Sequence, residues 1–401
     1  MIVPLSIESI AYMGAGVARA DGCVHFVHET CPGEKVTAEI VLEKKSFKEA
    51  RVVTVENPSP DRLAEPDCRL ETDKGRVRVP GCVYDHVTHE AELRYKHDQL
   101  LSFLTRQAKI ENAEELIGEP FVSPKTLHYR NKITLHSARG ADGKLLLGYF
   151  GDDNVTVIDI PQCPLAVPEI NEELTAMRRD KAFWRWLGLD NSVSLRWTEA
   201  DGVIVIPESK NEQGAELPAL LENTPIVGNL KVPARGFFQI NPEVGSALVS
   251  HVTGIVQECA PRELLDFYCG VGVFGLSASK VKVHKVVGFD SGRGVIRMAN
   301  FNAMSKGLPT RFFCEYASRV ASRALGQLPK NNTMAIADPP RAGLEKEVTA
   351  ALVATPVDNL VYVSCSPDTL SRDLATLVGS GVYKVRSTRI FDMFPRTAHF
   401  E

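Results

Sequence analysis

The spacing of hydrophobic positions changes along the chain and divides it into three parts. Residues 1–60 contain short β-rich runs such as CVHFVHE and KVTAEIVLE, separated by glycine turns. Short apolar runs bounded by turn residues are typical of β-strands in small sheets. We therefore expect residues 1–60 to form a small all-β module.

The middle part, residues 61–225, mixes helical and strand-like patterns. It follows a linker-like stretch, ENPSPDRLAEPD, which is rich in proline and charge. The segment EAELRYKHDQLLSFLTRQ then carries leucines at helical spacing, which predicts a helix over about 90–107 that packs on the following domain. Strand-length runs such as KITLHSA, KLLLGYF and GVIVIPE come next. We expect a central α+β region here.

The last part, residues 226–401, alternates short apolar runs with helix-like segments. The runs ELLDF, VVGFD, TMAIAD and LVYVSC all have strand length. Strands that alternate with helices indicate crossover connections and a doubly wound parallel sheet. The sequence therefore predicts an α/β protein whose C-terminal domain is built on such a sheet.

Composition restricts the cellular setting more than the function. The chain has 401 residues, 44% of them hydrophobic, and it contains no apolar run near the ~20 residues that a membrane helix needs. Nine irregularly spaced cysteines favour free thiols in a reducing compartment over a disulfide framework. The net charge of -4 means that any nucleic-acid surface must be local. We expect a cytoplasmic monomer that does not associate with membranes.

A glycine-rich turn follows the predicted strand ELLDF. Gly270 and Gly272 begin a G-x-G-x-x-G pattern, and Asp290 lies 20 residues after Gly270. This arrangement suits the ribose diol of either a nicotinamide dinucleotide or S-adenosylmethionine, so the turn alone leaves both open. The D-x-x-C-G sequence at the turn and the later Asp-Pro-Pro segment favour the methyl donor.

Three reactive groups indicate covalent methyl transfer to a pyrimidine. They are the thiol of Cys365 in VYVSCSPDTLSRDL, the carboxyl group of Asp338 in IADPPRAGL, and Glu401. Carbon 5 of uracil is a weak nucleophile until a thiolate adds to carbon 6, after which a base must remove the carbon 5 proton. Arg372 is a candidate for lowering the thiol pKa. The alternatives are a buried structural cysteine, a helix-capping aspartate and a frayed terminal glutamate.

Five motifs occur in the order seen in the RNA 5-methyluridine methyltransferases: FFQIN at 237–241, DFYCGVGVFGL, DPPRAGL, SCSPDTLSRDL and FPRTAHFE. The chain therefore resembles this family over most of its length, and in particular the 23S rRNA uracil-5-methyltransferases with an N-terminal TRAM domain. The resemblance implies a Rossmann-like class I methyltransferase sheet over 226–401 and an OB-like RNA-binding barrel over 1–60. It also implies S-adenosylmethionine as cofactor and RNA as partner.

The resemblance also implies residue roles. Cys365 would be the nucleophile, Glu401 the base that removes the carbon 5 proton, and Asp338 a contact to the uracil edge. Phe237 would lie near the flipped base, and the segment HYRNKI would bind RNA through Arg130 and Lys132. The methyl-donor pocket would be lined by Gln239, Tyr268, Gly270, Gly272, Asp290 and Asp338.

The chain departs from the family pattern in several places. Relatives usually continue past the final glutamate, so the sequence leaves open whether the chain is shortened after Glu401. Some relatives hold an iron–sulfur cluster through four thiolates, but this chain offers only Cys68, Cys82 and Cys163, with Val79 at the remaining position. We therefore expect no stable cluster and no other metal site.

Taken together, the sequence predicts an enzyme that methylates carbon 5 of a uridine in structured RNA. The N-terminal barrel favours ribosomal RNA over transfer RNA. A first rival is an RNA 5-methylcytosine methyltransferase, which usually carries a cysteine in its Asp-Pro-Pro segment, where this chain has Arg341. A second rival is a nonenzymatic RNA-binding protein on the same scaffold.

Overall fold

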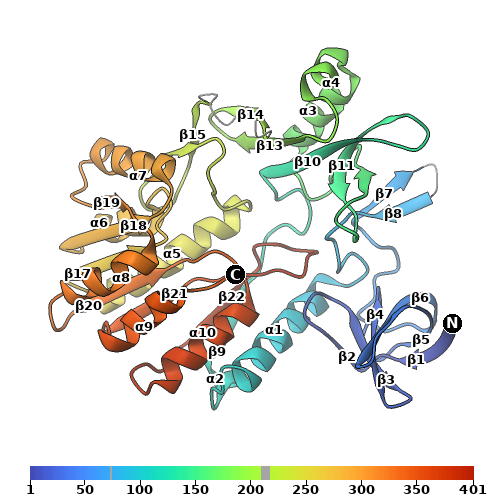
Figure 1. The fold of residues 1–401 in the computed structure, drawn as a ribbon, viewed down its shortest axis with the longest axis horizontal. Coiled ribbons are helices and arrows are strands. Elements are labelled where there is room, and N and C mark those ends of the chain that lie inside the picture. Colours follow the sequence, from blue (N-terminus) through green and yellow to red (C-terminus); the bar gives the residue numbers. More distant parts are fainter. Residues whose placement is uncertain (73–74, 209–216) are drawn as a thin grey trace.

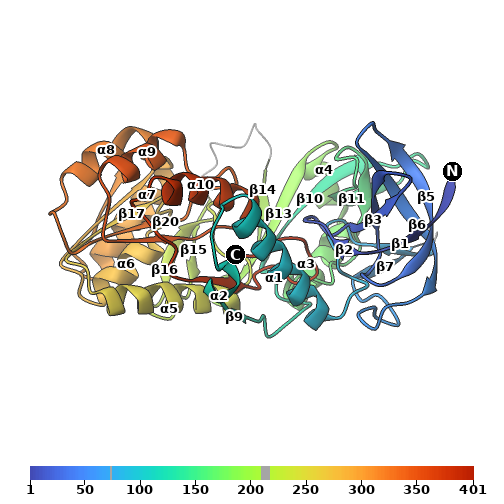
Figure 2. The same ribbon diagram turned by 90° about the horizontal axis from the view of Figure 1, so that it is seen from below.

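The described residues form three large sheets that follow one another along the sequence, together with three two-stranded sheets. The computed structural model of the protein describes residues 1–72, 75–208 and 217–401. In Figure 1 the N-terminal sheet (blue) and the C-terminal sheet (yellow to red) lie at opposite ends of the molecule, with the central sheet (green) between them. Figure 2, turned by 90°, shows the same order.

The N-terminal part is a six-stranded sheet with the order β1-β5-β6-β4-β3-β2. Its pairs are antiparallel except for β4 with β6. The strands alternate buried and exposed residues, and the buried set, which includes Leu5, Val27 and Ala38, forms a separate core. A hairpin follows the sheet. The elements are β1 (Ile2–Ser6), β2 (Ser9–Ile10), β3 (Gly16–Ala20), β4 (Cys23–His28), β5 (Lys35–Glu43), β6 (Phe47–Asn57), β7 (Arg69–Thr72) and β8 (Gly75–Arg78).

The central part is a five-stranded antiparallel sheet with the order β12-β11-β10-β13-β14. Helix α3 covers β13 and β14, and its Ile170 and Leu174 are fully buried against the sheet. The elements are α2 (Ala113–Leu116), β9 (Ile117–Phe121), β10 (Lys132–Arg139), β11 (Leu145–Phe150), β12 (Val157–Asp159), α3 (Pro168–Arg179), α4 (Lys181–Leu187), β13 (Ser192–Thr198), β14 (Gly202–Pro207), β15 (Ala219–Glu222) and β16 (Leu230–Pro233).

The C-terminal part is a five-stranded parallel sheet with the order β19-β18-β17-β20-β21. Helices α8 and α9 bury one face, and α5 and α6 bury the other, which explains why its strands are continuous apolar runs. The elements are α5 (Pro242–Cys259), β17 (Glu263–Phe267), α6 (Val273–Lys280), β18 (Lys285–Asp290), α7 (Arg293–Ser305), β19 (Arg311–Cys314), α8 (Ala317–Gly326), β20 (Thr333–Ala337), α9 (Lys346–Ala354), β21 (Asn359–Tyr362), α10 (Pro367–Gly379) and β22 (Thr388–Phe391).

The predicted fold class is confirmed. A Rossmann-like parallel sheet occupies the C-terminal part, and a β-rich module occupies the N-terminal part. No helix among the described residues is both long enough and apolar enough to cross a membrane.

Helix α1 (His89–Arg106) follows the N-terminal module in the sequence and packs against the C-terminal residues. Thr88 caps it by accepting a hydrogen bond from the Ala91 amide, 3.3 Å away. Its buried Leu100 and Leu104 pack in one cluster with Ile390 and Phe400 near the C-terminus, and α1 lies beside α10 (Figures 1 and 2). Strand β22 pairs in parallel with β9. The last 14 residues are therefore fixed against the segment that follows the N-terminal module.

A cluster of buried charged side chains stabilises the contact between α1 and the C-terminal residues. Lys96 on α1 donates hydrogen bonds to Glu92, at 2.6 Å, and to Asp392, at 3.1 Å, and all three side chains are inaccessible to solvent. Burial alone would raise the pKa of Asp392, but the Lys96 ammonium lowers it to about 2. A carboxyl group with a lowered pKa stabilises the fold above its unfolded pKa of ~3.9. This contribution is lost as the pH falls from about 4 to about 2.

Replacing Lys96 with methionine is expected to destabilise the protein strongly. The substitution removes the ammonium that Glu92 and Asp392 share and leaves these buried groups with Arg396 and His89 as their remaining basic partners. Breaking a buried ion pair typically costs about 3–5 kcal/mol. Urea unfolding followed by circular dichroism measures this loss. Lys125→Met is the control, because Lys125 pairs with Glu243 at the surface and exposed pairs contribute at most ~1 kcal/mol. Equal losses in the two variants would contradict this role of the cluster.

Candidate active site

The site lies where the parallel strands end. The turn after β17 carries Tyr268 and the glycines, β18 ends at Asp290, Asp338 follows β20, and Cys365 lies three residues beyond β21. Open α/β sheets bind their ligands outside the carboxyl ends of the strands. The topology therefore brings these sequence-predicted residues to one edge of the sheet, as expected from a doubly wound fold.

The turn between β17 and α6 is shaped for close approach of a ligand. Gly270 and Gly272 have φ angles of +52° and +87°, which side chains rarely tolerate, and a Cβ on Gly270 would meet open space. The Gly270 amide donates to Asp290 Oδ2 at 3.0 Å, and the Gly292 amide donates to Asp290 Oδ1 at 2.8 Å. These bonds hold the Asp290 carboxylate at the rim of the turn, where a ribose diol fits.

Asp266 stabilises the turn between β17 and α6. It is fully buried, and its Oδ2 accepts a hydrogen bond of 2.8 Å from the Gly275 amide. Burial raises the pKa of Asp266 to about 8, and the charges of Asp338 and Asp290 contribute to the rise. Its Oδ1 is buried without a hydrogen-bond partner among the described residues. An open glycine turn, a ribose-facing acid and an unsatisfied carboxyl oxygen together fit S-adenosylmethionine.

The other predicted pocket residues come from two further segments. Gln239 packs against the first turn of α5, where a Cβ on Gly245 would lie 2.8 Å from the Gln239 Cβ. The Tyr268 hydroxyl donates to Glu345, which ties the turn after β17 to the start of α9. Phe237 is 69% exposed and is therefore not part of the core, so its ring is accessible to a base.

Cys365 lies directly before Ser366, the N-cap of α10. Burial raises the pKa of the Cys365 thiol to about 11, and the nearby Glu401 and Asp338 carboxyl groups contribute to the rise. The Arg341 guanidinium opposes them. The thiol is half-buried rather than sealed in the core.

The two carboxyl groups beside the thiol retain protons readily. Burial raises the pKa of Asp338 to about 7. Burial and the charge of Asp338 raise the pKa of Glu401 well above its usual range. Glu401 is not frayed: its amide donates to the Phe391 carbonyl at 3.0 Å, and the Phe391 amide donates to the Glu401 carbonyl at 2.8 Å. Its Oε2 is buried and has no partner among the described residues, so this oxygen can accept a proton.

The cation at the thiol is Arg341, not Arg372 as the sequence suggested. Arg372 donates to Asp373, at 2.7 and 2.9 Å, and to the Ala342 carbonyl, at 2.8 Å. An acidic neighbour one residue along the helix therefore turns the guanidinium of Arg372 away from Cys365. In the sequence, Arg341 is notable only because it stands where RNA 5-methylcytosine methyltransferases usually carry a cysteine.

The segment that carries Arg341 is fixed to α10. Thr369 donates to the Arg341 carbonyl at 3.0 Å, and Asp373 accepts from the Leu344 amide at 2.8 Å. Because Cys365 lies directly before α10, these bonds set the position of the guanidinium relative to the thiol. The Asp-Pro-Pro segment and the cysteine segment thus form one rigid unit.

Replacing Arg341 with glutamine is expected to make the Cys365 thiol less acidic. Removing the guanidinium leaves the Glu401 and Asp338 charges unopposed, so we expect the thiol pKa to rise by about one unit and the thiolate fraction at pH 8 to fall on the order of tenfold. The pH dependence of Cys365 alkylation by iodoacetamide, followed by mass spectrometry of its peptide, measures this change. Arg372→Gln is the matched control and should leave the profile unchanged.

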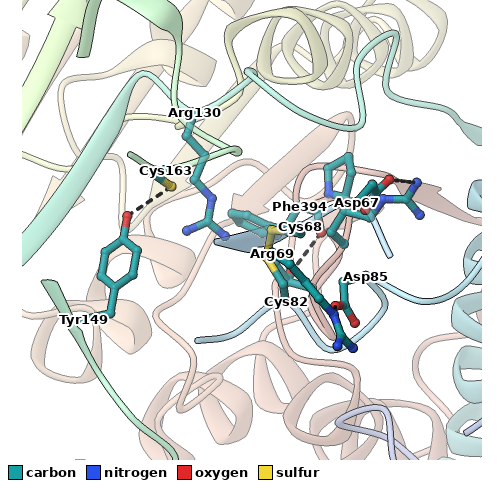
Figure 3. The surroundings of a disulfide bond; sticks show 12 residues. Asp67, Cys68, Arg69, Cys82, Asp85, Arg130, Tyr149, Cys163 and Phe394 are labelled. Carbon is teal, nitrogen blue, oxygen red and sulfur yellow. Dashed lines mark hydrogen bonds and ion pairs between the residues drawn. A yellow bond between two sulfur atoms is a disulfide. The ribbon is translucent and has the colours of Figure 1, made fainter. Parts of the chain in front are cut away.

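The predicted RNA-binding segment 128–133 is placed at the junction of the central and C-terminal parts. Tyr129 is buried, and its hydroxyl donates to the Pro395 carbonyl at 2.9 Å, so it offers no exposed stacking surface. Arg130 extends from this segment into the interior (Figure 3). Lys132 is half-buried, and burial lowers its pKa. Between them, the Asn131 amide donates to the Ile240 carbonyl at 2.9 Å, next to Gln239.

Of the three cysteines considered as iron–sulfur cluster ligands, two are bonded to each other. The structure joins Cys68 and Cys82 in a disulfide, although the cysteine spacing favoured free thiols over a disulfide framework. Cys163 is free, and its sulfur accepts a hydrogen bond from the Tyr149 hydroxyl at 3.3 Å. Figure 3 shows Arg130 extending between Cys163 and the disulfide. Among the described residues no group of three or more His, Cys, Asp or Glu side chains is arranged to hold a metal ion. The expectation about the cluster stays a prediction.

The fold and the site define the class of the protein. A parallel sheet with helices on both faces, a glycine turn after its first strand and an acid at the end of the second are typical of S-adenosylmethionine-dependent methyltransferases. Residues 229–401 match the family model described as tRNA (Uracil-5-)-methyltransferase. The C-terminal part of the chain is therefore similar to this family, and the chain is an S-adenosylmethionine-dependent RNA methyltransferase.

The similarity to known proteins extends over almost the whole chain. An uncharacterized RNA methyltransferase of Halalkalibacterium halodurans is 27% identical and covers 100% of this chain and 95% of the relative. The 23S rRNA (uracil(1939)-C(5))-methyltransferase RlmD of Chromohalobacter salexigens is 29% identical and covers 99% of this chain and 87% of the relative. The crystal structure of Pyrococcus abyssi tRNA (uracil-54, C5)-methyltransferase with S-adenosyl-L-homocysteine has the same fold, with a TM-score of 0.71, 22% identity, and coverage of 99% and 98%.

Proposed function

We propose that the protein makes 5-methyluridine in ribosomal RNA through a transient covalent bond between Cys365 and the target uracil. One observation carries the proposal. The thiol of Cys365, the carboxyl groups of Asp338 and Glu401 and the guanidinium of Arg341 act on one another electrostatically, although they come from three separate segments. These are the groups that carbon 5 methylation of a pyrimidine requires.

The first step activates the ring. The Cys365 thiolate adds to carbon 6 of uracil, and the electron pair of the carbon 5–carbon 6 bond moves toward the carbon 4 oxygen as an enolate. Arg341 favours the thiolate. Asp338, whose pKa is about 7, can donate a hydrogen bond to the enolate oxygen when protonated. Carbon 5 thereby becomes a nucleophile.

The second step restores the ring. S-adenosylmethionine, when bound, supplies an electrophilic methyl group to carbon 5. The Glu401 carboxylate then accepts the carbon 5 proton, the double bond between carbons 5 and 6 re-forms, and the Cys365 thiolate leaves with its electron pair. The raised pKa of Glu401 suits a group that must hold this proton until solvent removes it. The net reaction exchanges one ring proton for one methyl group.

Ribosomal RNA is the favoured substrate for two reasons. The chain carries a β-rich module at its N-terminus, and small β-barrels bind RNA through its backbone and unpaired bases. The Chromohalobacter relative, which aligns over almost the whole chain, acts on 23S rRNA. Transfer RNA is the second candidate, because the Pyrococcus protein of the same fold acts on transfer RNA.

Nucleoside analysis tests the proposal. RNA from cells that lack the gene is incubated with the protein and a labelled methyl donor, and the modified nucleotide is mapped. We expect 5-methyluridine at a defined position in 23S rRNA. 5-Methyluridine in transfer RNA would overturn the choice of RNA, and 5-methylcytidine would overturn the choice of base. RNA binding without any methyl transfer would support the nonenzymatic alternative.

A further inference from the structure

A turn of the N-terminal module reaches the catalytic segment. Ala11 to Gly14 connect β2 and β3, and the Gly14 amide donates to the Ala11 carbonyl at 3.0 Å. In the views of Figures 1 and 2 the β2 end of this sheet lies beside α1. In the sequence, this turn lies more than 350 positions before Cys365.

The turn is held in place from two sides. Gln99 on α1 donates to the Ala11 carbonyl at 3.2 Å, and the ring of Tyr12 meets that of Phe103 edge-on, with 5.4 Å between centroids. On the other side, a Cβ added to Gly14 would lie 2.7 Å from the Val83 side chain. These contacts hold the turn against α1, and α1 packs against α10.

Tyr12 faces the segment that carries the nucleophile. Its hydroxyl is within reach of the Ser366 side chain, and Asp368, Arg341 and Cys365 are close enough to act on it electrostatically. Burial of about half of this side chain raises the Tyr12 pKa, and the hydrogen bond with Ser366 lowers it. An aromatic residue of the N-terminal module thus lies close enough to Cys365 to interact with it electrostatically.

The backbone conformation of Met13 is unfavourable for a residue other than glycine. It occupies the third position of the turn with φ +75°, where glycine or asparagine is usual, and its side chain is 50% exposed. A non-glycine residue in this region typically costs about 1–3 kcal/mol. Packing does not explain the choice of methionine, because half of the side chain contacts solvent. Such strain is common at ligand-binding positions.

We propose that Tyr12 and Met13 form a base-binding rim of the active site, which takes an unpaired nucleobase of the RNA next to the target uridine. The inference rests on the proposed RNA methylation. A flipped uridine leaves its neighbours unstacked, and aromatic and polarizable apolar side chains provide replacement stacking surfaces. The N-terminal module then completes the catalytic site rather than only tethering the RNA.

Met13→Gly separates RNA binding from folding. Glycine relieves the backbone strain, so the thermal midpoint should not fall, but the stacking surface is lost. We expect the dissociation constant for the substrate RNA to rise roughly 5- to 100-fold. Asp21→Gly is the matched control. Asp21 is exposed, has φ +51° and lies at the opposite end of β3, so the same relief of strain there should leave RNA binding unchanged.

Tyr12 variants test the aromatic half of the rim. Tyr12→Ala should weaken RNA binding to a similar extent, and Tyr12→Phe should restore affinity relative to alanine because the ring is retained. Affinity for S-adenosylmethionine, measured by calorimetry, should not change in either variant. Filter binding of RNA does not require turnover, so its result is independent of whether methyl transfer occurs. RNA affinity within twofold of the native protein for both Met13→Gly and Tyr12→Ala would overturn the inference, whereas absence of uridine methylation by the native protein would overturn the proposed function.

Discussion

Replacing Cys365 with alanine is expected to abolish methyl transfer. The substitution removes the only group in the proposed mechanism that can add to carbon 6, and loss of a catalytic nucleophile typically reduces turnover by at least about 10⁴-fold. The native protein mixed with its RNA and the methyl donor should also give a protein–RNA species that survives denaturing electrophoresis. This species should be absent from the variant.

Cys259→Ala provides the control for the cysteine experiment. Cys259 is a free cysteine at the end of α5. Its removal should leave both methyl transfer and the denaturation-resistant species intact. Undiminished turnover by Cys365→Ala would exclude the covalent mechanism.

Replacing Glu401 with glutamine is expected to stop the reaction after the methyl group has been transferred. Glutamine fills the same space but cannot accept the carbon 5 proton, so the ring cannot expel Cys365. General bases typically contribute about 10²–10⁴-fold to rate. We therefore expect slow turnover together with an accumulated protein–RNA adduct that contains the labelled methyl group.

The two variants should therefore differ in what they accumulate. Cys365→Ala should give no adduct, and Glu401→Gln should give more adduct than the native protein. Glu258→Gln serves as the control, because Glu258 forms an exposed ion pair with Arg386. Native turnover in Glu401→Gln would assign the base to another group.

The sequence predicted the strands of the C-terminal sheet well because those strands are buried on both faces. The runs ELLDF, VVGFD and TMAIAD correspond to β17, β18 and β20. A strand covered by helices on both sides must be apolar throughout, and short apolar runs are visible without knowledge of the fold. The topology rule for open sheets then located Asp290, Asp338 and Cys365 at one edge.

The partners of the thiol could not be predicted in the same way. Choosing Arg341 over Arg372 required the direction of the Arg372 side chain, which is determined by its hydrogen bonds to Asp373 and the Ala342 carbonyl. The contribution of Tyr12 depended on how the N-terminal module sits beside α1. The segment HYRNKI is predicted to bind RNA, but the surrounding polypeptide buries the ring of its Tyr129. Each of these features depends on contacts between distant segments.

The packing of α1 against the C-terminal residues limits where this chain can be divided into fragments. A fragment cut at residue 226 would keep the parallel sheet but lose the helix that covers Ile390 and Phe400 and neutralises Asp392. Such a fragment would expose an apolar face and leave an acidic group without its counter-charge. Chimeras that exchange the methyl-transferring half between relatives should therefore carry residues 89–106 along with it, despite the gap of more than a hundred residues between the two pieces.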